Sequence, residues 1–291
     1  FGTQIGHYGQ GGGLPPSGYL EGSALETEAD GSFIINVSCT PKPKNWLPMQ
    51  PETGCLVVRQ TFLDRDQETP AELLIECVNN NEQPQHASAL LTPKQVDDGL
   101  KSASTLVAGA AVLFAKWARD FQRHSNQLPL FDPAVSNAAG GDPNIMYYHS
   151  HWALAPDEAL IIEATPPVCE HWNFQLNNYW MESLDYTQFR IHTNKHLAHY
   201  EADGSVRIIV AHRDPGLPNW LSTAGHESGT MCFRWIKAQQ HPQPRTRVVK
   251  VSELAALASQ SSRLSASSHT HAQNHDNKNY EKESAGNIES L

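Results

Sequence analysis

The chain lacks a long apolar run and an excess of basic residues. Its longest apolar candidate, Thr105–Ala115, falls well short of the ~18 residues that a membrane helix needs. Lys and Arg number 21 against 31 Asp and Glu, which leaves a net charge of -10. Nucleic-acid binders instead carry a basic stripe. We therefore expect neither a membrane nor a nucleic acid as partner.

Paired cysteines and a nucleophile motif are also missing. The five cysteines are scattered, and no two of them form a Cys-x-x-Cys pair. A disulfide framework needs closer, paired spacing, so we expect reduced thiols that behave as small buried hydrophobic residues. This favours a reducing compartment, and we assign the chain to the cytoplasm. No Gly-x-Ser-x-Gly nucleophile elbow occurs in the sequence.

An internal repeat is present instead. Three pieces recur in one order at offsets of 173, 174 and 175 residues (28 to 201, 45 to 219, 59 to 234). They are Glu28–Ser32 as Glu201–Ser205, Asn45–Leu47 as Asn219–Leu221, and Arg59 as Arg234. A shared order at nearly one offset indicates two copies of one supersecondary unit.

Each copy reads as a series of strands after an Asp-Gly turn. The predicted strands are Phe33–Ser38, Cys55–Phe62 and Glu72–Val78 in the first copy, and Val206–Ala211, Thr230–Lys237 and Arg247–Val251 in the second. The second copy has three further strands upstream: Asn144–Ala155, Asp157–Thr165 and Trp172–Trp180. Counterparts of these would lie before Phe1, so we expect an N-terminally incomplete first copy and a natural protein that extends further.

One long helix separates the copies. Thr92, Pro93 and Gln95 form a capping-box pattern, and the helix can run to about His124. Its middle, residues 106–118, is apolar on most sides, as in a buried helix. We therefore expect it to pack between the modules or to form a homo-oligomer interface.

The sequence thus predicts a mainly β protein in four parts. The boundaries are 1–88 for a first β module, 89–126 for the helix, 127–259 for a second β module and 260–291 for a tail. The tail is rich in Ser, His, Asn and Lys, which predicts disorder because it can bury little apolar surface.

Several motifs resemble the bacterial family called domain of unknown function 1214, over about residues 142–237. They are Asp157–Glu163, Pro166-Pro167, Trp172–Leu176, Asp203–Ser205, His212–Gly216, Asn219–Leu221, Thr223–His226 and Arg234-Trp235. The resemblance implies jelly-roll-like β-sandwich modules with added helices, and it implies little about function. Relatives often also carry the domain of unknown function 1254.

Residues that differ between the copies are candidates for chemistry. The second copy has His212, Arg213, Asp214 and His226 where the first has Cys39, Thr40, Pro41 and Pro51. A histidine oriented by a carboxylate is a minimal general acid/base unit, so His212, Asp214 and His226 are the catalytic candidates. In the alternative, His212 and Asp214 only hold the turn that follows.

Other residues are candidates for ligand binding. Arg213 and Arg234 could hold an anion, because a guanidinium fork fits anionic oxygens. Trp172, Asn173, Asn177 and Trp220 combine aromatic faces with amides, which suits sugars or polar rings. The structural alternative is an ion pair for Arg234, and strand or corner packing for Trp172, Asn173, Asn177 and Trp220.

Metal binding is a minority interpretation. His149 and His151 share one strand face and could bind a divalent metal together, but the carboxylate spacing of a cupin is missing. His192, His196 and His199 lie in a loop-like stretch and are predicted to be solvated. We therefore expect no cofactor.

The favoured function is binding and turnover of a small polar or amphipathic metabolite in a His/Asp/Arg-lined cleft of the second module. The alternatives are a non-catalytic carbohydrate or small-ligand binding module, and an oligomeric interaction subunit. Whether the protein is an enzyme stays open at this point.

Overall fold

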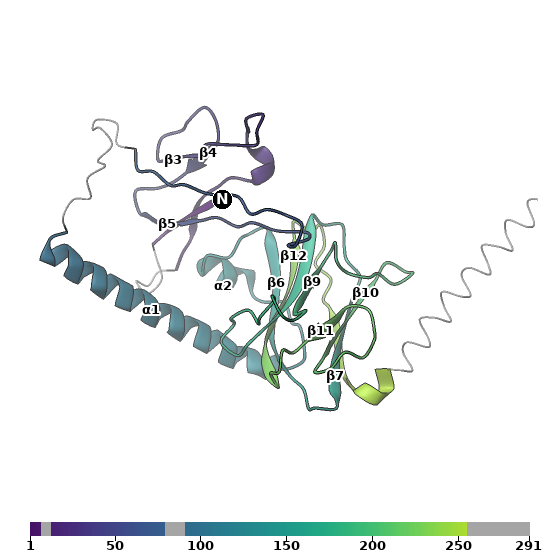
Figure 1. Cartoon of the computed structure of the whole chain (residues 1–291). Helices are drawn as coiled ribbons and strands as arrows, with labels where there is room; N and C mark the ends of the chain where they lie inside the picture. Colours follow the sequence, from purple (N-terminus) through teal and green to yellow (C-terminus); the bar gives the residue numbers. More distant parts are fainter. Residues whose placement is uncertain (7–12, 79–90, 255–291) are drawn as a thin grey trace, which may run out of the picture.

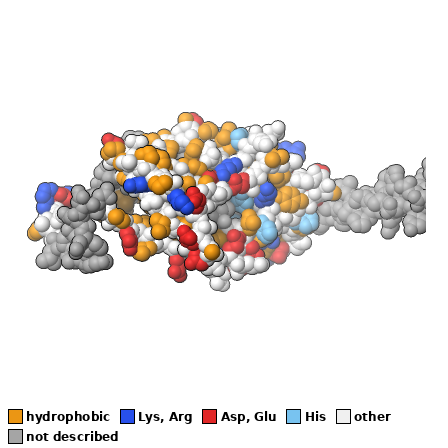
Figure 2. Space-filling view, turned by 90° about the horizontal axis from the view of Figure 1, so that it is seen from above, with side chains coloured by type: hydrophobic (Ala, Val, Ile, Leu, Met, Phe, Trp, Pro, Cys, Tyr) orange, Lys and Arg blue, Asp and Glu red, His pale blue; other side chains and the backbone are white. Residues whose placement is uncertain are grey.

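The computed structural model describes residues 1–6, 13–78 and 91–254. The predicted tail, 260–291, lies outside these residues. A mainly β body is joined to one long helix (Figure 1). Within the described ranges no helix has the length and apolarity to cross a membrane. On the face in Figure 2, acidic and basic side chains are interspersed.

The second module consists of two four-stranded sheets. The first has the order β6-β12-β8-β9, with β6 at Ile145–Ala153, β12 at Ser228–Ile236, β8 at His171–Asn177 and β9 at His192–Asn194. The second has the order β11-β10-β7-β13, with β11 at Trp220–Ser222, β10 at Val206–Ala211, β7 at Glu158–Ala164 and β13 at Arg245–Lys250. These bounds confirm the second-copy strands to within a few residues.

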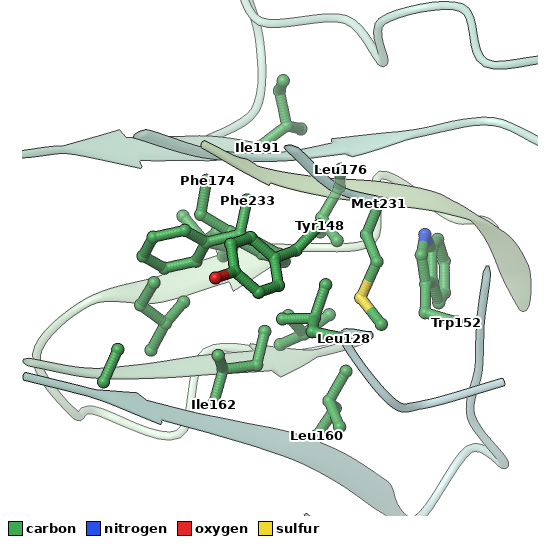
Figure 3. Close-up of a cluster of buried hydrophobic side chains, with 14 of the residues drawn as sticks. Leu128, Tyr148, Trp152, Leu160, Ile162, Phe174, Leu176, Ile191, Met231 and Phe233 are labelled. Atoms are coloured by element: carbon green, nitrogen blue, oxygen red, sulfur yellow. The ribbon is translucent and has the colours of Figure 1, made fainter. Parts of the chain in front are cut away.

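Strand alternation places the main core between these two sheets (Figure 3). Alternate residues of β12, namely Met231, Phe233 and Trp235, are fully buried there. They meet Leu160 and Ile162 of β7 in one cluster. Successive side chains of a strand point to opposite faces, so the residues between them face outward.

The first module is smaller. One sheet has the order β2-β1-β5, with β2 at Pro16–Tyr19, β1 at Gly2–Ile5 and β5 at Thr53–Val57. The other pairs β3 (Asn36–Ser38) with β4 (Trp46–Pro48) in parallel. A 3-10 turn, η1, spans Gly22–Ala24.

Two asparagines with positive φ form matching corners in the two modules. Asn45 (φ 42°) exchanges two hydrogen bonds with the backbone of Glu26, both 2.8 Å long. Asn219 (φ 55°) does the same with the backbone of His199 at 2.7 Å. Asparagine tolerates the left-handed region and bonds nearby backbone, which explains its use at these turns.

The tryptophan after each asparagine also makes the same contact in both modules. Trp46 Nε1 donates to the backbone oxygen of Ser38 (3.0 Å), and Trp220 Nε1 donates to that of Ala211 (3.1 Å). Both therefore tie a short parallel strand to its neighbour, β4 to β3 and β11 to β10.

The helix α1 spans Pro93–Phe121 and continues as a 3-10 turn, η2, over Gln122–His124. The capping box of Thr92 and Gln95 is confirmed. A second helix, α2, spans Pro133–Ala138.

Of the two predicted environments of the helix, packing between the modules is not found for most of the length of α1 among the described residues. Leu100, Val107 and Val112 are 65%, 68% and 70% exposed, and only Ala118 and Phe121 are buried. The helix reaches the second module at its C-terminal end (Figure 1). Composition shows that a helix is apolar, but it does not show what covers it. The homo-oligomer through residues 106–118 stays a prediction.

The predicted strand at Glu72–Val78 was also wrong. Residues 71–78 form no regular secondary structure, and the side chains of Leu74 and Ile75 are largely exposed. The first-copy strand predicted at Phe33–Ser38 shrinks to the three residues of β3. Among the described residues, β3 pairs with β4 alone and residues 71–78 pair with no strand.

Candidate functional site

The outward face of the β6-β12-β8-β9 sheet is polar. Because the strands are in register, their outward side chains form rows across the sheet. One row is Tyr147, Arg234, Asn173 and Asn194; the next is His149, Cys232, Gln175 and His192; a third is His151, Thr230 and Asn177. The sheet thus carries an apolar core on one face and hydrogen-bonding groups on the other.

A segment of the first module crosses this polar face and turns one end of it into a cleft. Asn194 Nδ2 donates to the backbone oxygen of Leu63 (3.1 Å), which anchors the segment over β9. The cavity is about 330 Å³. It is lined by Gln60, Thr61, Phe62, Leu63, Arg65, His171, Asn173, Phe174, Gln175, Ser183, Tyr186, Ile191, His192, Asn194 and Leu197. A cavity of this size fits a small metabolite.

Two arginines give the cleft its charge. Arg65 lies over the Tyr186 ring, 4.6 Å from its centre, and donates to the Tyr186 hydroxyl (3.3 Å). Arg234 donates to Asn173 Oδ1 (3.0 Å), so its guanidinium adjoins the lining. The lining contains no Asp or Glu among the described residues. In a chain of net charge -10, this cleft is a local cationic site.

Two histidines in the cleft are held neutral. Burial lowers the pKa of His192 most, and Arg190 and Arg65 lower it further. Burial likewise lowers the pKa of His171, and Lys195 adds to this while Glu170 opposes it. His171 Nδ1 is buried without a hydrogen-bond partner.

Two of the three predicted catalytic residues, His212 and Asp214, make structural hydrogen bonds. His212 Nδ1 bonds Thr223 Oγ1 (2.9 Å) and Nε2 bonds the backbone oxygen of Leu154 (3.2 Å), so both ring nitrogens are used. Asp214 accepts from the backbone N–H of Gly216 (2.8 Å) and caps that turn. No hydrogen bond joins the His212 ring to Asp214 in the described chain. The side chain of His226 is exposed.

We expect His212→Ala to lower the free energy of unfolding by about 1–3 kcal/mol, because it leaves the buried Leu154 carbonyl and Thr223 hydroxyl without their partner. The exposed His226→Ala is the control and should change stability by less than about 0.5 kcal/mol. Chemical denaturation of both variants measures the difference. Equal stabilities would show that His212 is not a structural tie.

The predicted ligand-binding residues divide between cleft and core. The structure brings together Asn173 and Arg234 through their hydrogen bond. Trp172 is fully buried in the core, where Nε1 donates to the Tyr200 hydroxyl (3.1 Å). Asn177 is buried at the end of β8 and accepts from Gln175 Nε2 (2.6 Å). Trp220 holds its corner, and Arg213 is exposed outside the cavity.

The two histidines proposed for a metal are otherwise engaged. The His149 ring stacks between Phe121 and Tyr147, at 5.3 and 5.5 Å between centres. His151 Nδ1 bonds Ser125 Oγ at 2.8 Å. In the part of the chain that the structure describes, no group of three His, Cys, Asp or Glu is placed to hold a metal ion.

Sequence reasoning missed Arg65, His171 and His192 as members of the cleft. Arg65 follows a predicted strand of the first copy, and His192 was assigned to a solvated loop. His192 lies on β9 opposite Gln175 because β9 pairs with β8, and a long loop separates these two strands in the sequence. The single available signal was the polar alternation of β8, which marks an outward polar face.

Comparisons with known proteins give one family match and two similar solved structures. Residues 159–240 match the family described as protein of unknown function DUF1214. An uncharacterized protein from Burkholderia cenocepacia, known from a crystal structure, is 51% identical, with a TM-score of 0.81 over 86% of this chain and 69% of that chain. The VPA0106 protein from Vibrio parahaemolyticus is 15% identical, with a TM-score of 0.34 over 56% and 47% of the two chains. No curated protein matches.

The structure is thus that of a mainly β protein with one long helix and a polar cleft. The chain is a member of the DUF1214 family.

Proposed function

We propose that this protein binds a small anionic, polar metabolite in the cleft between the outer face of β8 and β9 and the segment 60–65. The observation that carries the proposal is the position of Arg65 in a cavity whose described lining contains no Asp or Glu. Arg65 supplies a cation that the lining does not neutralise, and the His171 ring lies in the same lining.

The other lining groups favour a polar ligand. Asn173, Gln175 and Ser183 offer amides and a hydroxyl that can donate or accept hydrogen bonds. The Arg65 guanidinium stacks on the Tyr186 ring, which holds it in place. Less side-chain entropy is therefore lost when its other N–H groups bind a ligand. A hydrogen bond to a charged group contributes about 1.5–3 kcal/mol, so one arginine accounts for a large share of the affinity.

Binding is favoured over acid/base turnover. No carboxylate among the described lining residues orients His171 or His192, and burial lowers the pKa of each ring, which makes both weaker bases. A neutral imidazole can accept a proton, so turnover would begin at one of these two rings. The proposal therefore moves the functional histidines from His212 and His226 to this cleft.

A matched pair of ligands tests the proposal. We expect glucose 6-phosphate or citrate to raise the melting temperature by several degrees, and glucose to raise it much less. In Arg65→Gln the affinity for the anions should fall about 10- to 100-fold, because one charge-assisted hydrogen bond is lost. Arg213→Gln, which removes an exposed arginine outside the cavity, should leave it unchanged.

Equal anion responses in wild type and Arg65→Gln would contradict the proposal. A response to glucose that survives Arg65→Gln would instead support the carbohydrate-binding alternative. In that case the amides of Asn173 and Gln175, and not the arginine, would carry recognition.

A further inference from the structure

The side-chain amides on the floor of the cleft are oriented by their neighbours. An amide can donate through its nitrogen or accept through its oxygen, and a ligand meets whichever end is not already engaged. Arg234 can only donate, so its hydrogen bond to Asn173 Oδ1 (3.0 Å) fixes which end of that amide is used. The end of Asn173 that remains for a ligand is therefore the donor, Nδ2.

Gln175, the next outward residue of β8, has the opposite orientation. Its Nε2 donates to Asn177 Oδ1 (2.6 Å), and Asn177 is buried at the end of the strand, outside the described lining. The end of Gln175 that remains for a ligand is Oε1, which can only accept. Successive outward residues of a strand lie about 7 Å apart, and this is the spacing between the donor and the acceptor along β8.

Ser183 adds a second acceptor at the Gln175 end of the cleft. Its hydroxyl donates to the backbone oxygen of Leu184 (2.9 Å), which leaves the lone pairs of Oγ for a ligand. Ser183 forms a backbone bridge with Asn177, which places it beside the strand end that follows Gln175. Two lining groups at this end of the cleft therefore require a donor from the ligand.

Asn194 shows the contrast, because both ends of its amide are engaged within the protein. Its Nδ2 donates to the backbone oxygen of Leu63 (3.1 Å). Its Oδ1 accepts from the backbone N–H groups of His196 and Leu197, both at 2.9 Å. Asn194 therefore shapes the cleft and leaves hydrogen bonding with a ligand to the other polar groups of the lining.

These polarities define what a bound molecule must supply. Arg65 and Asn173 offer donors to an anion, whereas Gln175 and Ser183 require a donor in return. An ammonium group donates, but the described lining has no Asp or Glu to compensate a second cation beside Arg65. A hydroxyl group donates without charge, so it is the donor that fits this end of the cleft.

We propose that the cleft selects organic anions that carry a hydroxyl group, the chemistry shared by hydroxycarboxylates and sugar phosphates. Gln175 is the specificity-determining residue, because its Oε1 accepts from the hydroxyl. Asn177 is the positioning residue that keeps this oxygen turned to the ligand. The inference rests on the proposed function, since it concerns the anion bound at Arg65. An anion without the hydroxyl leaves desolvated acceptors without a donor and therefore binds more weakly.

Matched anions that differ in hydroxyl groups test the selection by calorimetry with the full chain. Citrate is compared with tricarballylate, which lacks its hydroxyl, and glycerol 3-phosphate is compared with propyl phosphate. We expect the hydroxylated member of a pair to bind about 3- to 10-fold tighter, the effect of one hydrogen bond. The pair with the higher affinity identifies the anionic group as carboxylate or phosphate.

Gln175→Met tests the residue, because it keeps the length of the side chain but not its amide. The affinity ratio within each pair should fall to about 1 in this variant. Gln240→Met changes an exposed glutamine outside the cavity and should keep the wild-type ratio. A ratio that survives in Gln175→Met would overturn the assignment to Gln175.

The same titrations in Arg65→Gln separate this selection from the proposed function. Binding that depends on Arg65 but has equal affinities within each pair would overturn the selection and leave the anion site in place. No Arg65-dependent binding of any of these anions would overturn both.

Asn177→Asp and Asn177→Ala test the positioning residue. Aspartate can only accept, so it keeps Gln175 Nε2 engaged, and the ratio should persist although the added charge weakens both anions alike. Alanine frees Nε2 and lets the amide present either end, so the ratio should fall toward about 1. The ratio is measured within one protein, so a loss of stability alone does not change it. A retained ratio in Asn177→Ala, or a lost one in Asn177→Asp, would overturn the role of Asn177.

Discussion

Replacing Trp172 with alanine should lower the free energy of unfolding by about 3–5 kcal/mol, the range for removing a buried aromatic side chain. Trp172 is fully buried, stacks on Phe233 with 5.6 Å between ring centres, and bonds the Tyr200 hydroxyl. Alanine loses all three contributions and leaves a cavity in the main core. Urea unfolding followed by far-UV circular dichroism measures the change.

Trp180→Ala is the matched control, because the Trp180 side chain is 57% exposed. It should change stability by less than about 0.5 kcal/mol. The result also separates the two sequence interpretations of Trp172. A small loss of stability in Trp172→Ala together with loss of ligand response would return Trp172 to the binding site.

Acid should destabilise the protein through its buried histidines, and His149 should contribute most. Burial, together with the smaller effect of the Arg234 charge, lowers the pKa of His149 to about 3. The unfolded chain takes up a proton near pH 6.5, whereas the folded chain does so only near pH 3. Stability therefore falls as the pH drops through this window, at up to about 1.4 kcal/mol per pH unit.

His149→Phe keeps a ring between Phe121 and Tyr147 but cannot take up a proton. We expect the loss of stability between pH 6 and pH 4 to be about 2 kcal/mol smaller in this variant than in the wild type. Urea unfolding at both pH values gives the comparison, with the exposed His226→Gln as control. An unchanged loss of stability in His149→Phe would place the acid sensitivity elsewhere.

The strands of the second module were predictable because the pattern of apolar and polar residues that marks a strand lies within the strand itself. Apolar and polar residues alternate along β8 and β12, and a continuous apolar run marks β7, which is buried on both faces. The cleft was not predictable in the same way. It depends on which strands pair and on a segment near residue 63 that is anchored by Asn194, 131 residues from Leu63 in the sequence.

Two failures have one physical cause. The predicted burial of α1 and the predicted strand at Glu72–Val78 both came from apolar composition. Apolar composition indicates that burial of a segment is favourable, but burial also requires another part of the protein that packs against it. Val107 and Leu74 are exposed because the described chain supplies no such neighbour to either.

The central position of β12 limits how this protein can change during evolution. The strand pairs along its full length with β6 and over seven residues with β8. Its side chains point alternately to the core and to the polar face, and Arg234 on the polar face lies between the core residues Phe233 and Trp235. A one-residue deletion there would shift the alternation and send the arginine into the core. We therefore expect β12 to change during evolution by substitution only, and insertions and deletions to occur in the loops.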